Sequence, residues 1–114
     1  MSQISENDFL AIADRLLTRI EDAIEVADID ADCTRQDNVL TIEFDNGSKI
    51  IVNSQTPNRE IWVAAKSGGY HYRLVDAQWK DLRNGSELAA ALSKEVSAQS
   101  GHALILSVWC VARQ

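Results

Sequence analysis

An asparagine–glycine pair between two alternating segments is the feature that most narrows what this chain can fold into. Residues 39–44 and 49–53 each alternate apolar with polar side chains, and Asn46-Gly47 lies between them. Both residues of such a pair tolerate the positive φ angles of the tight turns that join antiparallel strands. The pattern therefore predicts a β-hairpin. Its core side is expected to carry Leu40, Ile42, Phe44, Ile50 and Val52.

Three further short runs predict that the hairpin continues into an antiparallel meander. They cover residues 61–65, 70–74 and 78–80, and Ser67-Gly68-Gly69 is interpreted as the turn between the first two. Because successive side chains of a strand point to opposite faces, the alternation sorts them into two sets. The core set is Ile61, Val63, Tyr70, Tyr72 and Leu74, and the outward set is Trp62, His71 and Arg73, beside Asn53 and Gln55 of the hairpin.

Segments with helical periodicity precede and follow these strands. In residues 6–27, apolar side chains recur every three or four positions, as on a helix with one buried face. A second helix is expected to start with Ser86 as its N-cap and to end near Gly101. The order of helix, strands and helix predicts an α+β fold. We expect a two-layer α-β sandwich, with two helices packed on one face of a mostly antiparallel five- to six-stranded sheet.

Chain length and the two ends indicate one domain in the cytoplasm. The 114 residues are expected to form a single domain, residues 1–114. Residues from about 103 to 114 form an extension too apolar for a free tail, but too short for the roughly 20 residues that span a membrane. The polar, acidic start does not resemble a signal peptide, so we expect no membrane partner. Cys33 and Cys110 form no metal-binding or redox motif, and both thiols are expected to stay reduced.

The negative charge of the chain is concentrated in its first third. Residues 1–38 contain ten acidic and three basic side chains, a net charge of −7, whereas the remainder has a net charge of +1. This asymmetry favours a cationic partner or a metal ion. It disfavours nucleic acid, whose phosphates would be repelled, and we expect no nucleic acid partner.

Four of these acids share one face of the first predicted helix. They follow one another at spacings of seven, four and three, which places them in line: Asp14, Glu21, Glu25 and Asp28. Asp30 and Asp32 are expected to continue the line from a loop that leads into the first strand. Carboxylates supply hard oxygen ligands, so an open metal site of modest affinity is one interpretation. An ordinary solvated helix face is the other.

Three motifs, together with the acidic first helix, resemble the frataxin family and in particular its bacterial CyaY branch. The motifs are Gly47-Ser48-Lys49-Ile50-Ile51-Val52-Asn53-Ser54-Gln55-Thr56-Pro57, Glu60-Ile61-Trp62-Val63-Ala64 and Gly68-Gly69-Tyr70-His71-Tyr72. An Asn-x-Gln-x-Pro hairpin exit that is followed at this distance by Ile-Trp is specific. The resemblance covers residues from about 6 to 102.

The resemblance implies an iron-binding regulator of iron–sulfur cluster assembly that is not an enzyme and uses no organic cofactor. Ferrous and ferric iron would bind weakly on an acidic ridge, whose candidate ligands are Glu6, Asp8, Asp14, Glu21, Asp22, Glu25, Asp28, Asp30 and Asp32. The implied partners are the cysteine desulfurase and the iron–sulfur scaffold protein. The partner-binding candidates are Asn53, Gln55, Glu60, Trp62 and Arg73. The expected state is a monomer, with iron-dependent oligomers as an alternative.

Two positions depart from the family pattern. Glu60 stands where the family usually has glutamine, which bears on contact with the scaffold. Val26 stands where bacterial relatives tend to carry a second acid next to Glu25, which bears on one metal position.

Two other classes of function stay open at this stage. A ferroxidase or iron-storage protein would need clustered Glu and His side chains that face a bundle interior, and the sequence shows no such set. An acidic interaction domain without metal would bind its partners independently of iron.

Overall fold

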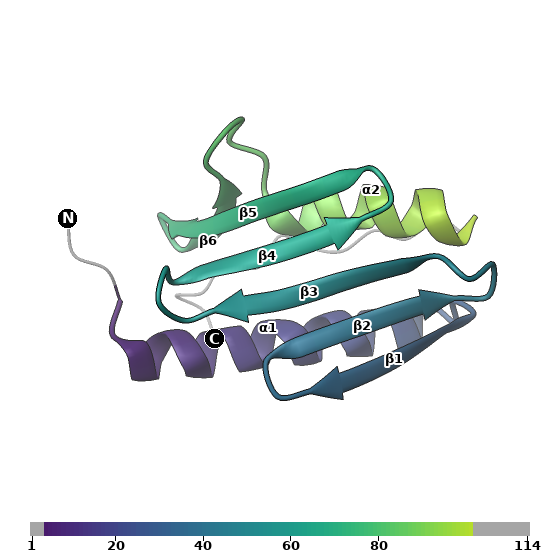
Figure 1. The fold of residues 1–114 in the computed structure, drawn as a ribbon, viewed down its shortest axis with the longest axis horizontal. Coiled ribbons are helices and arrows are strands. Elements are labelled where there is room, and N and C mark those ends of the chain that lie inside the picture. Colours follow the sequence, from purple (N-terminus) through teal and green to yellow (C-terminus); the bar gives the residue numbers. More distant parts are fainter. Residues whose placement is uncertain (1–3, 102–114) are drawn as a thin grey trace.

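The sheet is built from six strands that are neighbours both in sequence and in space. Every strand pairs antiparallel with the next, in the order β1-β2-β3-β4-β5-β6. The computed structural model describes residues 4–101, in which one helix precedes the sheet and another follows it (Figure 1). The elements are α1 (Glu6–Val26), β1 (Ala31–Gln36), β2 (Val39–Phe44), β3 (Lys49–Gln55), β4 (Glu60–Ala65), β5 (Gly68–Val75), β6 (Gln78–Asp81) and α2 (Leu88–Ser100).

Both helices cover the same face of the sheet and leave the other face open (Figure 1). This arrangement confirms the predicted α+β class and the two-layer sandwich. The apolar extension expected from about residue 103 to 114 lies outside the described residues, and the single domain over residues 1–114 stays a prediction. Neither described helix combines the length and the apolar character needed to cross a membrane.

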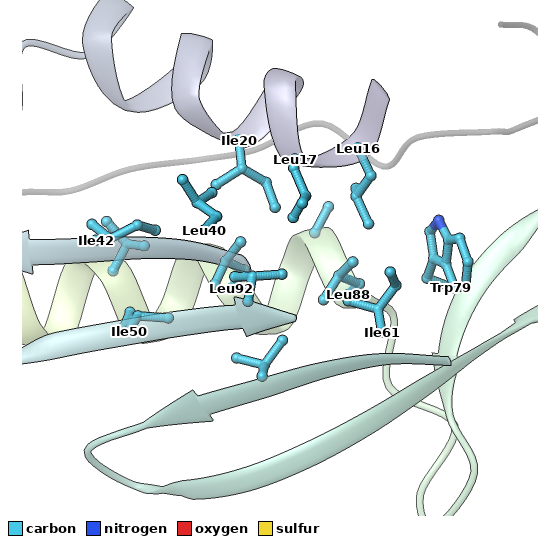
Figure 2. Packing of buried hydrophobic residues seen from close by; sticks show 14 of the residues in the cluster. Leu16, Leu17, Ile20, Leu40, Ile42, Ile50, Ile61, Trp79, Leu88 and Leu92 are labelled. Atoms are coloured by element: carbon cyan, nitrogen blue, oxygen red, sulfur yellow. The ribbon is translucent and has the colours of Figure 1, made fainter. Parts of the chain in front are cut away.

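The core lies between the helices and the covered sheet face. Leu16, Leu17 and Ile20 point from α1 toward buried side chains of the sheet (Figure 2). At one end of this layer the rings of Phe9 and Trp79 pack edge to face, with centroids 6.1 Å apart. The five side chains predicted for the core side of the central hairpin are all buried: Leu40, Ile42, Phe44, Ile50 and Val52. Removal of this apolar surface from water is the main force that holds the two layers together.

The structure corrects the predicted start of the sheet. The sequence predicts that Asp30 and Asp32 lie in a loop leading into the first strand, but Asp32 belongs to an additional strand, β1, which pairs with β2. The sequence does not predict this strand because its partly buried side chains are Ala31, Cys33 and Arg35, and none of them is a large hydrophobic residue. Pairing with β2, rather than intrinsic propensity, therefore makes this segment a strand.

Two local assignments also change. Gly68 and Gly69 begin β5 instead of forming the turn before it. Glu87, and not Ser86, is the N-cap of α2, because the Glu87 side chain accepts a hydrogen bond from the backbone N–H of Ala90. Ser86 is held in the preceding loop, where its carbonyl accepts from the N–H of Asp81.

Gln99 ties the end of α2 to two turns of the sheet. Its Oε1 accepts a 2.8 Å hydrogen bond from the backbone N–H of Lys66, and its Nε2 donates 3.1 Å bonds to Ser48 Oγ and to the carbonyl of Lys49. The side chain of Asn46 donates in turn to the carbonyl of Gln99. Gln99 is buried, and these bonds are partly shielded from water.

We predict that Gln99→Ala lowers the free energy of unfolding by about 2 kcal/mol, because it removes a buried side chain and leaves two partly buried backbone groups without their partner. Chemical denaturation measures this change. The exposed Lys94→Ala on the same helix is the control and should stay within about 0.5 kcal/mol of the parent. Equal stability of the parent and the Gln99 variant would contradict this role.

Candidate functional site

The acidic ridge divides into parts with different surroundings. At its start, Ser5 caps α1 by accepting a hydrogen bond from the N–H of Asp8. Glu6 and Asp8 lie in the first turn, where carboxylates interact favourably with the positive end of the helix dipole. At 1.5 Å per residue, Glu6 lies roughly 28 Å from Glu25 along α1. Glu6 and Asp8 therefore stabilise the start of the helix, and they lie too far from Glu25 to bind the same ion.

Arg35 neutralises the middle of the ridge. It reaches from β1 to α1, where Nη2 forms an ion pair with Asp14 and Nη1 lies 3.6 Å from Glu21. The same Nη1 donates a 3.1 Å hydrogen bond to Thr18. Sequence spacing does not reveal these pairs, because Arg35 is 21 positions away from Asp14 and lies on a strand that the sequence does not predict.

Carboxylates lie in the last turns of α1 and just beyond its C-cap, at the end of the helix where they are least favourable. Asp22, Glu25 and Asp28, hereafter the helix-end carboxylates, are all exposed. The last turn contains no basic residue that could balance the negative end of the helix dipole. Asp28 has a φ of 56°, in the left-handed region that Asp and Asn tolerate better than most residues. This acidic helix end is therefore a place where a bound cation would stabilise the fold.

Beyond the helix, the structure adds two acids that the sequence analysis missed, Glu43 of β2 and Asp45 of the turn that follows it. Together with the predicted Asp30 and Asp32, they line a hollow of about 270 Å³. Asp32 pairs with Glu43 across the strands, and both side chains are exposed, on the face of β1 opposite to Arg35. Recognition of β1 as a strand would have revealed this pair, because the register of the hairpin brings them together.

The pKa of the Cys33 thiol is affected by the negative charges of this region. Burial raises the pKa of the Cys33 thiol, and the charges of Glu21, Asp32 and Glu25 raise it further. The cysteine is therefore held in its protonated form, which is a poor nucleophile.

As they stand, the ridge carboxylates form an open row and not a closed metal site. Within residues 4–101, no three His, Cys, Asp or Glu side chains converge on one point that could hold a metal ion. The donors are nevertheless of the hard oxygen type, and most are exposed and free to rotate. A row of this kind suits weak and exchangeable binding of a hard cation.

A second candidate surface lies on the open face of the sheet, around Trp62. The indole of Trp62 stacks on the imidazole of His71, with centroids 4.2 Å apart and planes 6° apart. Its Nε1 donates a 2.7 Å hydrogen bond to Glu60, which also accepts a 2.6 Å bond from Arg73. The N–H of the indole is thus used internally, and its ring surface is what a partner could contact.

The structure brings the five partner-binding candidates together but gives them unequal exposure. Asn53 lies opposite Trp62 in the β3–β4 register, and Gln55 lies opposite Glu60. The side chain of Glu60 is only 9% exposed, so it supports Trp62 and Arg73 rather than offering a surface of its own. Whether any of these residues binds a partner stays a prediction.

Comparison with known proteins identifies the family to which this chain belongs. The model of the frataxin-like domain matches residues 2–102 of this chain. The iron-sulfur cluster assembly protein CyaY of Paraburkholderia phymatum is 52% identical over 86% of this chain and 93% of its own length. The protein of the same name from Ralstonia nicotianae is 54% identical over 88% of this chain and 92% of its own.

Solved structures agree with this result. The frataxin of Psychromonas ingrahamii superposes with a TM-score of 0.86 at 33% identity, covering 91% of this chain and 99% of that one. The trimeric frataxin of the yeast Saccharomyces cerevisiae, complexed with ferrous iron, gives a TM-score of 0.64 at 31% identity, over 89% of each chain. Sequence and fold point the same way, and the chain belongs to the frataxin family, in its bacterial CyaY branch.

Proposed function

We propose that this protein is an iron-binding regulator of iron–sulfur cluster assembly that acts by binding and not as an enzyme. The names of its relatives support a role in cluster assembly, and the ferrous complex of yeast frataxin supports iron as the ligand. The observation that carries the proposal is the exposed acidic end of α1, whose last turn contains no basic residue. The proposed compartment is the cytoplasm, and the proposed state without iron is a monomer.

Iron would bind first at the helix-end carboxylates. Asp14 and Glu21 are already paired with Arg35, so an ion there would have to displace a guanidinium. Glu25 and Asp28 instead lie at the exposed end of α1, where the helix dipole is negative. Like charges one helical turn apart repel each other, and a cation relieves that repulsion. The hollow that is lined by Asp30, Asp32, Glu43 and Asp45 offers a neighbouring, second position.

The proposed partners are the cysteine desulfurase and the scaffold protein, each with its own surface. The acidic ridge is complementary to a basic patch, which suits electrostatic attraction to the desulfurase. The open sheet face offers an aromatic side chain with amide groups beside it, a composition typical of a protein-binding hot spot. The acidic ridge follows α1, which lies on the covered face of the sheet (Figure 1), whereas Trp62 belongs to the open face, so both partners could be bound at once.

A ferroxidase or iron-storage protein is the alternative. Oxidation chemistry at bound iron generally uses converging Glu and His side chains. The described residues 4–101 hold no converging group of three such ligands, and for this reason we favour the regulator.

The first prediction concerns the position of the metal. Titration with ferrous iron without oxygen, followed by amide NMR, should shift resonances of residues 21–32. The variant Asp22→Asn/Glu25→Gln/Asp28→Asn should lose the shifts of residues 21–28, and asparagine also tolerates the positive φ that position 28 adopts. The control Glu6→Gln/Asp8→Asn, at the other end of the helix, should respond like the parent. Unchanged shifts in the triple variant would contradict the proposed site.

A second prediction concerns Arg35. Arg35→Gln removes the internal cation, so ferrous iron should bind severalfold more tightly and shift the amides of Asp14 and Glu21 as well. Without iron the melting temperature should fall, because two acids lose their partner. Lys66→Gln makes the same change in net charge on the exposed β4–β5 turn and should leave iron binding as it is. If both variants behave alike, Arg35 has no specific influence on the ridge.

The third prediction concerns the open sheet face. Trp62→Ala should weaken binding to the scaffold protein by about thirtyfold in calorimetric titrations, the loss expected for a hot-spot residue. Thr34→Ala, an exposed change on β1, should bind like the parent. Circular dichroism should show both variants folded. Full affinity of a folded Trp62 variant would place the scaffold contact elsewhere.

A further inference from the structure

A cavity of about 460 Å³ lies between α2 and the β5–β6 edge of the sheet, apart from both surfaces described so far. It is lined by Tyr70 and Tyr72 of β5, Asp81 of β6, and Glu87, Ala91 and Glu95 at and along α2. It exists because β6 is short and pairs with β5 only at residues 72–75, whereas β4 pairs with β5 from residue 68 to 73. Its volume is in the range of known ligand sites.

Two buried carboxylate oxygens in the walls of this cavity lack hydrogen-bond partners among the described residues. They are Oδ2 of Asp81 and Oε2 of Glu87. The Asp81 side chain is only 2% exposed. Each carboxylate is fixed through its other oxygen, since Asp81 Oδ1 accepts from the N–H of Arg83 at 2.8 Å and Glu87 Oε1 caps α2. An unpaired buried acceptor is unfavourable, so native proteins usually give it a partner.

The charges around the cavity favour a cation as that partner. Asp81, Glu87 and Glu95 are acidic, and Lys94 is the one basic residue among the lining side chains. Burial raises the pKa of Tyr72 to about 12, and the charge of Asp81 is the next cause of the rise. The cavity thus places a buried carboxylate, Asp81, in a region of negative potential.

Arg83 shows which kind of cation two of the lining residues, Tyr70 and Asp81, accept from the chain itself. Its guanidinium lies over the ring of Tyr70, 5.7 Å from the centroid. Its Nη2 donates to the carbonyl of Gly69, and its Nε lies 3.6 Å from Asp81 Oδ1. A metal ion is less suitable, because residues 4–101 contain no converging set of three ligands. A planar guanidinium can meet carboxylate oxygens and an aromatic face together.

We propose that this cavity binds the guanidinium of an arginine side chain that an extended segment of a partner protein presents. The orphaned oxygens of Asp81 and Glu87 accept its N–H donors. The outer edge of β5 supports an extended segment, since residues 68–71 pair with no strand on that side in the described part of the chain and, of their backbone groups, the Gly69 carbonyl accepts from the Arg83 side chain. Such an edge can add a strand from a partner. This inference is independent of iron binding and of the open sheet face.

The test is amide NMR titration of the full chain with the peptide acetyl-Ala-Arg-Ala-amide. The control peptide replaces arginine with citrulline, which has the same shape and no charge. The arginine peptide should give saturable shifts at Tyr70, Tyr72 and Ala91, and the citrulline peptide should bind at least about tenfold more weakly. Equal binding of the two peptides, or no saturable shift at these positions, would overturn the proposal.

Matched variants separate the site from general charge effects. Asp81→Asn and Glu87→Gln each remove a charge while keeping the oxygen that accepts the internal bond, and each should weaken the arginine peptide about tenfold. Asp76→Asn removes an exposed charge in the β5–β6 turn and should bind like the parent. If Asp81→Asn does not fold, Glu87→Gln alone decides. Binding of parental strength in a folded cavity variant would disprove the site.

Discussion

Burial of one sheet face beneath two helices is the constraint on which the rest of the molecule depends. The apolar side chains of α1, α2 and alternate strand positions form one layer, in which Ile61, Trp79 and Leu92 are almost fully buried (Figure 2). Because α1 commits one side to this layer, its other side is free to carry charge. Because the helices cover only one face of the sheet, the other face is free to present Trp62. Both proposed binding surfaces are consequences of the same asymmetric packing.

The acidic end of α1 destabilises the fold when no cation is bound, and this is the physical reason for proposing that iron binds there. Glu25 lies where the helix dipole is negative, and Asp28 has a positive φ. Arg35 relieves the repulsion at Asp14 and Glu21, in the middle of the ridge, and does not reach the helix end. A site that is unfavourable when empty and favourable with a cation couples metal binding to the stability of the fold.

The sequence predicted the elements that have a regular apolar spacing, and it did not predict those that form only through pairing in the folded chain. The span of α1, the central hairpin and the outward position of Trp62 all follow from regular spacing, and the structure confirms them. β1 has no large hydrophobic residue, so its strand, and with it the Arg35 ion pairs and the meeting of Asp32 with Glu43, could not be predicted. The hydrogen bond that Glu60 accepts from the Trp62 indole depends on side-chain geometry, so it could not be predicted from sequence spacing.

Thermal unfolding with and without ferrous iron, in the absence of oxygen, tests the central claim most directly. Iron at about ten times its dissociation constant should stabilise the parent by about 1.4 kcal/mol, which corresponds to a rise of several degrees in melting temperature. The variant Asp22→Asn/Glu25→Gln/Asp28→Asn should melt higher than the parent without iron and gain less from iron than the parent does. An equal rise in both proteins, or a variant that melts lower than the parent, would contradict the account.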